Sequence, residues 1–156
     1  MPKADVQMGP EEVAAYLGAQ RNATLASVGP AGFPHQVAMW FLPEPRRIVM
    51  WTYRRSQKAV NLRRNPRASL LVQDGDAYDS LRGVVVQGEV ELLDDTPSVL
   101  EIGNALHARY GGGYGDDPAA YRAVIAQQAP KRVGILLPMQ RVFSWDFGKL
   151  PGAGGA

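Results

Sequence analysis

The stretch "RRIVMWTYRRSQKAVNLRRNPRASLLVQD", residues 46–74, predicts a strand, a short helix and a second strand in succession. Its apolar and β-branched runs at 46–52 and 68–74 are typical of strands. Between them, Ser56 is a favourable helix N-cap, and Pro66 disfavours helical geometry at the residue before it. We therefore expect a helix of about two turns that begins after Ser56 and ends before Pro66.

Most of the remaining chain also predicts short strands. The further strands are expected at 23–42 (two strands joined by a turn), 82–95, 132–138 and 141–147, the last two as a pair. Further helices are expected at 9–20, 97–110 and 119–128. Strands do not alternate with long helices, which argues against a doubly wound parallel sheet. The sequence predicts a mainly β fold, a small antiparallel barrel with peripheral helices, in which Gly88 allows a strand to bend.

The length of 156 residues suits a single domain, expected over residues 1–150, with a disordered Gly/Ala tail at 151–156. The chain has no cysteine, which excludes disulfides, thiolate metal sites and cysteine nucleophiles. Its start is polar, and no apolar run reaches the ~20 residues needed to cross a bilayer. A cytoplasmic protein without a membrane partner is therefore expected.

Positive charge is concentrated in the central stretch, although the net charge of the chain is only +2. Residues 51–72 carry six cations: Arg54, Arg55, Lys58, Arg63, Arg64 and Arg67. A helix N-terminus presents unpaired N–H groups that suit an anion. Lys58 stands in the first turn, where the helix dipole disfavours a cation by a few tenths of a kcal/mol unless an anion compensates. The charges predict a phosphate site or an ordinary solvated basic helix; no nucleic-acid-binding module accompanies them.

Side chains suited to acid–base or nucleophilic chemistry are scarce. His35 and His107 stand far apart without metal-ligand spacing, so no metal site is expected, and no serine lies in a hydrolase-type elbow. The three tryptophans, Trp40, Trp51 and Trp145, fit either the walls of a flat-ring pocket or a packed core. A bound redox cofactor would supply the chemistry that the side chains lack.

Three segments carry a family resemblance: "HQVAMWFLPEPRRIVMWTYRRSQKAVNLRRNPRASLLV" at 35–72, "LRGVVVQGEVELLDD" at 81–95 and "RVFSWDFGKL" at 141–150. Over residues 10–150 the chain resembles the split-barrel flavin/deazaflavin oxidoreductase superfamily that includes the pyridoxamine 5′-phosphate oxidases. The last segment resembles the probable F420-dependent subgroup. The resemblance implies a split β-barrel and a homodimer, with cofactor sites at the subunit interface and a small-molecule substrate.

The resemblance also implies which residues meet the cofactor. Its ring and ribityl chain would lie along residues 36–41 and 50–52, and its phosphate would meet residues 56–58. The implied cofactor-binding residues are Gln36, Val37, Ala38, Met39, Trp40, Trp51, Thr52, Ser56, Gln57 and Lys58. We infer that Arg54 and Arg55, just before Ser56, would meet the anionic tail of F420. Trp145 and Asp146 are candidates to complete the site of the second chain, the alternative being a buried tryptophan and a strand-end acid. No residue is assigned a catalytic role.

Three positions depart from the flavin-binding oxidases of the superfamily. Those oxidases have Arg at the positions of Gln36 and Gln57, and Gln at the position of Gly83. The loss of two cations and one polar contact favours F420 over FMN. The sequence is thus interpreted as an F420-dependent oxidoreductase that transfers a hydride between the cofactor and a small organic substrate. The alternatives are an FMN-dependent oxidase or reductase of the pyridoxamine-phosphate-oxidase type, and a non-catalytic cofactor- or haem-binding protein.

Overall fold

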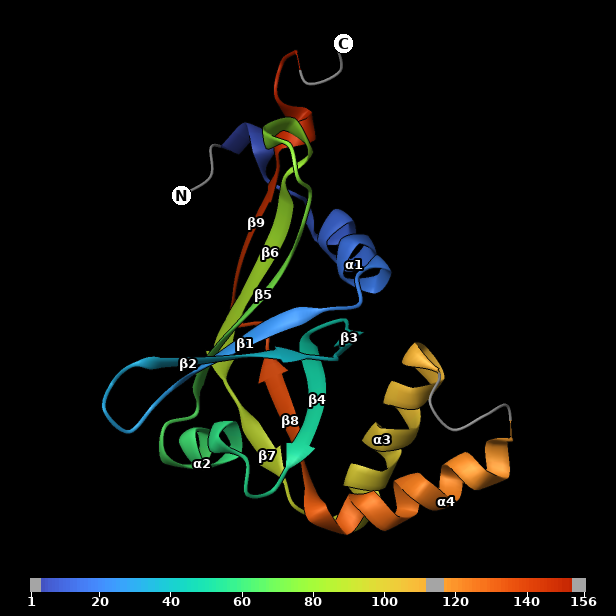
Figure 1. Cartoon of the computed structure of the whole chain (residues 1–156). Helices are drawn as coiled ribbons and strands as arrows, with labels where there is room; N and C mark the ends of the chain where they lie inside the picture. The colour runs from blue at the N-terminus through green and yellow to red at the C-terminus, as the bar shows by residue number, and fades with distance from the viewer. Residues whose placement is uncertain (1–3, 112–116, 153–156) are drawn as a thin grey trace.

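Two antiparallel sheets form the body of the molecule, which confirms the expected mainly β split barrel (Figure 1). The structure is a computed structural model that describes residues 4–111 and 117–152. The larger sheet has the order β2 (Pro34–Met39), β1 (Ala23–Val28), β5 (Arg67–Asp74), β6 (Arg82–Glu89), β9 (Arg141–Asp146). The smaller sheet has the order β3 (Leu42–Glu44), β4 (Arg47–Tyr53), β8 (Arg132–Pro138), β7 (Glu91–Leu93).

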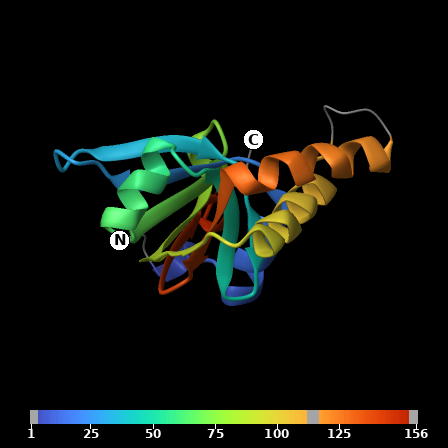
Figure 2. The ribbon, with the colours of Figure 1, turned by 90° about the horizontal axis from the view of Figure 1, so that it is seen from below.

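The helices lie around the sheets, as expected (Figures 1 and 2). The α-helices are α1 (Pro10–Ala19), α2 (Gln57–Arg64), α3 (Thr96–Tyr110) and α4 (Pro118–Gln128). Short 3-10 turns are η1 (Ala4–Val6), η2 (Tyr78–Ser80), η3 (Ala129–Lys131) and η4 (Phe147–Lys149). Within the described ranges, no helix is both long and apolar enough to span a membrane. Of the expected disordered tail, 153–156 lies outside the described residues, whereas Pro151 and Gly152 form a turn.

The expected pairing of the last two strands is wrong. β8 pairs with β4 and β7 in the smaller sheet, whereas β9 pairs with β6 in the larger one. The expected long strand at 82–95 is likewise divided, because β6 belongs to the larger sheet and β7 to the smaller. At this crossing a Cβ atom on Gly88 would lie 2.3 Å from the carbonyl oxygen of Pro138. Gly88 therefore permits a close approach of two backbones at the point where the sheets meet.

The main core fills the space between the two sheets and α1. Its largest fully buried side chains include Leu17, Leu25, Phe41, Ile48, Met50, Leu70, Ile135 and Leu137. A second, smaller cluster of buried side chains joins the other face of the smaller sheet to α3: Val49, Ile102, Leu106 and Leu136. β4 contributes alternate residues to both clusters and is therefore buried on both of its faces.

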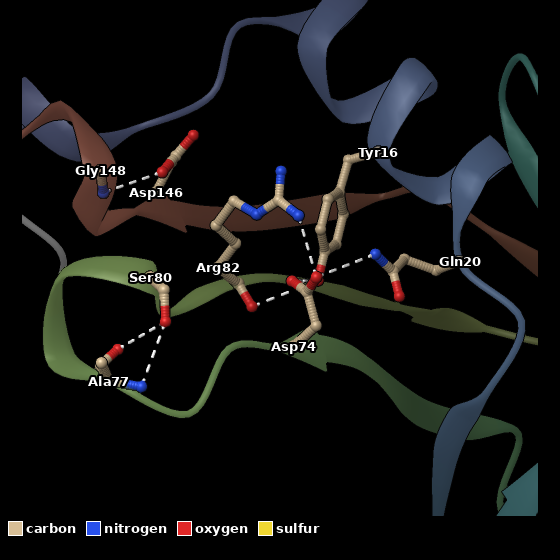
Figure 3. Close-up of polar contacts among 8 residues, drawn as sticks. All are labelled: Tyr16, Gln20, Asp74, Ala77, Ser80, Arg82, Asp146 and Gly148. Carbon is tan, nitrogen blue, oxygen red and sulfur yellow. Dashed lines mark hydrogen bonds and ion pairs between the residues drawn. The ribbon is translucent and has the colours of Figure 1, made fainter. Parts of the chain in front are cut away.

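A polar cluster fastens α1 to the hairpin of β5 and β6 (Figure 3). The hydroxyl of Tyr16 donates to a carboxylate oxygen of Asp74 at 2.9 Å, and Arg82 pairs with the other oxygen at 2.9 Å. Burial and the contact with Asp74 raise the pKa of Tyr16, so its hydroxyl remains a donor. Burial alone would raise the pKa of Asp74, but hydrogen bonds from Arg82 and Tyr16 together hold that pKa below its ordinary value.

Substituting Gly88→Ala should destabilise the fold. The new methyl group meets backbone rather than a movable side chain, so we expect a loss of about 1–3 kcal/mol in the free energy of unfolding. The matched control is Gly18→Ala in α1, where nothing lies within 4 Å of the added Cβ atom. That variant should be as stable as the wild type or more so, since alanine favours a helix. Urea denaturation measures both variants, and equal stability of the two would contradict the crossing contact.

Substituting Asp74→Asn should change how stability depends on pH. The lowered pKa of Asp74 means that its charged form stabilises the native state above the unfolded-state pKa of about 3.9 and that this stabilisation disappears as pH falls through the lower native pKa. The stability difference between the wild type and the variant should therefore shrink in acid. Urea denaturation at neutral and acidic pH, with the exposed Asp76→Asn as the control, measures it. A pH-independent difference would argue against an ionised Asp74.

Candidate functional site

The start of α2 is capped from within the chain. The hydroxyl of Ser56 accepts a hydrogen bond from the backbone N–H of Ala59 at 3.3 Å, and it lies 3.1 Å from the hydroxyl of Thr52. The predicted N-cap is therefore confirmed, and α2 ends at Arg64, as the proline at 66 indicates. Since the first N–H groups of a helix lack partners within it, this end of α2 offers donors to a ligand.

Lys58 occupies an electropositive position in the first turn of α2. Burial, followed by repulsion from the nearby Arg132, lowers the pKa of Lys58 below its ordinary value. Lys58 thus carries its charge at a helix end that itself has partial positive charge. A phosphate group placed here would relieve both the repulsion and the unfavourable dipole interaction. These residues fit a phosphate-bearing cofactor.

Arg54 is held by groups of its own chain. Its guanidinium lies 2.6 Å from the carboxylate of Asp94 and donates to the backbone oxygens of Asp94 and Arg132. Arg63 donates to the backbone oxygen of Arg54 at 2.7 Å and lies 3.6 Å from the same carboxylate. The charge of Arg54 is therefore already balanced, and the residue fixes the loop before α2. Arg55, the other arginine expected near an anionic tail, has an exposed side chain.

The side chain of Gln57 lies along α2 and contacts Asn61, one turn further toward the C-terminal end of the helix. Its amide donates to the side-chain oxygen of Asn61 at 2.8 Å, and the Asn61 amide donates to the hydroxyl of Ser27 in β1 at 3.1 Å. Asn61 is completely buried. Asn61 and Ser27 thus orient α2 against the larger sheet, a role that sequence reasoning missed. The available signal was an asparagine between the apolar residues of a short amphipathic helix.

The β2 positions predicted to line a cofactor ring point in two directions. Gln36 and Ala38 are exposed on the outer face of the larger sheet, and Trp40, just beyond the strand, is also exposed. Val37 and Met39 instead pack with the main core. The side chains of Val37 and Met39 therefore point away from the outer face of the sheet. β2 is an edge strand whose outer backbone groups are available for hydrogen bonds.

Trp51 and Thr52, adjacent in β4, also face opposite sides. Thr52 is buried beside Ser56, whereas Trp51 faces α3. A Cβ atom on Gly103 would lie 2.5 Å from the Trp51 ring, so the backbone of α3 rests directly on the indole. The guanidinium of Arg132 lies 4.2 Å from the centroid of the Trp51 ring.

A cavity of about 680 Å³ brings Trp40 and Trp51 together. Its walls come from β4, α3, α4 and the start of β8. Trp40 stacks on Tyr110 of α3 with ring centroids 4.5 Å apart and planes 6° from parallel. Of the three tryptophans considered as walls of a flat-ring pocket, Trp40 and Trp51 therefore line one cavity. Tyr53 also lines it, and its backbone oxygen accepts the backbone N–H of Ser56 at 3.0 Å, so the cavity adjoins the segment that leads into α2.

Trp145 lies at the opposite edge of the larger sheet from β2. It pairs in register with Gly83, and a Cβ atom there would lie 2.2 Å from the indole. Trp145 therefore lies flat over the backbone of β6 because residue 83 has no side chain. Three strands separate it from β2 of the same chain. Its neighbour Asp146 accepts a hydrogen bond from the N–H of Gly148 at 3.0 Å (Figure 3).

A family model described as pyridoxamine 5′-phosphate oxidase matches residues 10–146. The chain belongs to this family. The resemblance seen in the sequence is thereby confirmed, and the family includes flavin- and deazaflavin-binding oxidoreductases. In the described part of the chain, no group of three or more metal-ligating side chains is gathered in one place.

Solved structures extend the family relationship. A conserved hypothetical protein of Mycobacterium tuberculosis, Rv2991, is 40% identical, with a TM-score of 0.85 over 97% of this chain and 94% of its own. An F420 reductase is 26% identical, with a TM-score of 0.65 over 83% of this chain and 94% of its own. HutZ, a haem storage protein of Vibrio cholerae, shares the fold at 16% identity and a TM-score of 0.67, over 86% of this chain and 93% of its own. A search of curated proteins finds no match.

This member of the pyridoxamine 5′-phosphate oxidase family also uses residues that its sequence does not single out. Asp94 and Arg132 stand far along the chain from the start of α2, yet they balance or repel its cations. Tyr110 is distant from Phe41 in sequence, yet its hydroxyl accepts the Phe41 N–H at 2.9 Å. Such contacts arise from the pairing of β4 with β8 and the packing of α3, which local sequence patterns do not encode.

Proposed function

We propose that the protein is an F420-dependent oxidoreductase that acts on a small organic substrate. The start of α2 carries the proposal, because the Ser56 cap leaves backbone N–H groups for a ligand and Lys58 stands in the same turn, an arrangement that fits a phosphate. The similarity to an F420 reductase at 26% identity supports the choice of cofactor. The cytoplasmic location stays a prediction.

The chain would bind and position the cofactor rather than perform acid–base chemistry. Lys58 and the adjacent backbone would hold the phosphate, and the edge of β2 would offer hydrogen bonds to the ring. Trp40 and Trp51 would exclude water beside it. When bound, F420 supplies a hydride in its reduced form, and solvent supplies the proton that completes reduction of the substrate. FMN and haem are the competing ligands.

We further propose that the site is shared between two copies of the chain. The strand register forms one row across the outer face of the larger sheet: Ala38, Thr24, Leu71, Val85 and Phe143. Trp145 stands in the next row, over Gly83. These aligned, largely apolar side chains suit a face that packs on a second copy. In that arrangement Trp145 of one chain would reach the cofactor held by Lys58 of the other.

Substituting Lys58→Ala should weaken F420 binding. Removing one charge-assisted contact to the phosphate should raise the dissociation constant about ten-fold or more. Fluorescence titration with F420 measures this, with parallel titrations of FMN and haem. The matched control is Arg67→Ala, which removes an exposed cation paired with Glu89 at 3.5 Å. Unchanged F420 affinity in Lys58→Ala would contradict the assignment of Lys58 to the phosphate site. Tighter binding of FMN or haem than of F420 would contradict the assignment of F420 as the cofactor.

Mixed dimers test whether the site is shared. Lys58→Ala and Trp145→Ala should each impair both sites of a homodimer, whereas a heterodimer of the two variants keeps one site intact. Two affinity tags isolate the heterodimer, which should recover about half of the wild-type F420-binding capacity. The control is a heterodimer of Lys58→Ala with Ser56→Ala. Both residues belong to the same chain's contribution to a site, so each site of this heterodimer is impaired and no F420-binding capacity should be recovered. A Lys58–Trp145 heterodimer that binds no more than its parents would overturn the shared site.

A further inference from the structure

An apolar groove runs between α1 and the edge strand β3 (Figure 1). Its volume of about 890 Å³ lies in the range of ordinary small-molecule sites, about 300–1,000 Å³. One face of α1 lines it at helical spacing, and residues 42–45 with Met139 form the opposite wall. We call this feature the α1 groove. Because none of its described lining residues is aromatic, it favours an aliphatic chain over a flat ring.

The floor of the α1 groove is rigid and its rim is open. Val13 and Leu17 form the floor, because their side chains also belong to the main core. Ala14 and Gly18, one turn apart on α1, are exposed, and nothing lies within 4 Å of a Cβ atom added at Gly18. Small residues therefore leave the groove accessible from solvent along α1.

The opposite wall is poorly suited to pair with another strand. β3 is the edge of the smaller sheet, but Pro43 lies within it and Pro45 directly follows it. Proline has no N–H group to donate to an added strand. The groove therefore fits a small ligand better than an extended peptide.

Arg109 closes the α1 groove at the C-terminal end of α1. Its guanidinium donates to the backbone oxygens of Leu17, Gly18 and Gln20, at 3.1, 3.2 and 2.5 Å. These bonds satisfy carbonyl groups that a helix end leaves without partners, and they balance the negative end of the helix dipole. The helix end therefore makes no demand on the second arginine of the groove, Arg21.

Arg21 places a positive charge at this end of the α1 groove. It is exposed, its guanidinium donates to the backbone oxygen of Arg109, and it lies 5.6 Å from the centroid of the Tyr110 ring. No carboxylate among the described residues forms an ion pair with Arg21. Since a guanidinium has five N–H donors, most of those of Arg21 remain for an anionic group of a ligand.

The carboxylates that line the α1 groove determine the direction in which a ligand binds. Glu44 is already paired with Arg47 at 2.5 Å. Glu11 lies in the first turn of α1, at the opposite end from Arg21, where the helix dipole favours its charge. A ligand with one anionic group therefore places that group beside Arg21 and its apolar part toward the start of α1.

We propose that the α1 groove binds an aliphatic carboxylic acid. Its carboxylate pairs with Arg21 through parallel hydrogen bonds, and its alkyl chain lies over Val13, Ala14 and Leu17. Each methylene group removed from water adds to the affinity. None of the residues assigned to F420 is among the described lining residues, so the groove is a second site that does not depend on the identity of the cofactor.

Calorimetric titration of the full-length protein with decanoate, below the concentration at which it forms micelles, tests the ligand class. Decyltrimethylammonium has the same chain with a positive head group, and propionate has the same head group with almost no chain. We expect decanoate to bind about ten-fold more tightly than decyltrimethylammonium and about a hundred-fold more tightly than propionate. Equal binding of decyltrimethylammonium would overturn the role of charge, and equal binding of propionate would overturn the role of the apolar walls.

Variants at two exposed positions locate the binding. Arg21→Gln should weaken decanoate about ten-fold without weakening decyltrimethylammonium, and Arg21→Lys should restore part of the loss. The control is Arg122→Gln, an exposed arginine of α4 that does not line the groove. Unchanged decanoate binding in Arg21→Gln would overturn the contact with the carboxylate.

Ala14→Trp should fill the α1 groove and weaken both decyl probes about ten-fold. The matched control is Ala15→Trp, since Ala15 is the next residue of α1 and is also exposed but does not line the groove. Both changes are at exposed positions of one helix, so both variants should keep the fold. Equal effects of Ala14→Trp and Ala15→Trp on decanoate binding would overturn the groove as the site.

Titration in the presence of F420 separates this inference from the proposed function. Decanoate should bind with unchanged affinity to the F420-loaded protein and to Lys58→Ala, because the two sites share no residue. Competitive displacement of decanoate by F420 would place decanoate in the cofactor site and overturn the inference. Decanoate binding that depends on Arg21 in a protein that fails to bind F420 would support the α1 groove and contradict the proposed function.

Discussion

The contact between Gly103 and the Trp51 indole determines where α3 lies. Because residue 103 has no side chain, the backbone of α3 rests on the ring, and any Cβ atom there would approach it to 2.5 Å. Ile102 and Leu106 then reach the second core, which leaves His107 and Tyr110 beside the cavity. The cavity, the stacking of Trp40 on Tyr110 and the position of α4 against α3 all follow from this one close approach.

The same device recurs at Trp145, where Gly83 lets an indole lie flat on the backbone of β6. In each case a large ring covers a glycine, so close packing fixes the position of the ring. The third tryptophan, Trp40, is held instead by stacking on another ring and remains 54% exposed. The tryptophans were predicted either as walls of a pocket or as core residues, and Trp51 combines both roles because β4 is covered on both faces.

Local patterns predicted the strands and helices well, because β-periodicity, the Ser56 cap and the proline at 66 act within a few residues. They failed for the partners of β8 and β9, since a connection of two residues suggests a hairpin whereas the chain crosses between sheets there. The residues of the candidate site also fall into two groups, those found from local sequence and those that depend on strand pairing. Ser56 and Lys58 were identified from the helix start alone, but the ion pair of Arg54 with Asp94 spans 40 residues of sequence and depends on β4 lying beside β8.

The cations of the central basic stretch therefore have different partners and different roles. Asp94 balances Arg54 and attracts Arg63, the side chain of Arg64 donates to the carbonyl of Val28, and Arg67 pairs with Glu89. Lys58 differs from these, because burial and the neighbouring Arg132 both disfavour its charged form. An ordinary solvated helix would place such a cation in water or beside a carboxylate. Its position in the first turn of α2 is unfavourable in the ligand-free protein, and a bound anion removes the cost.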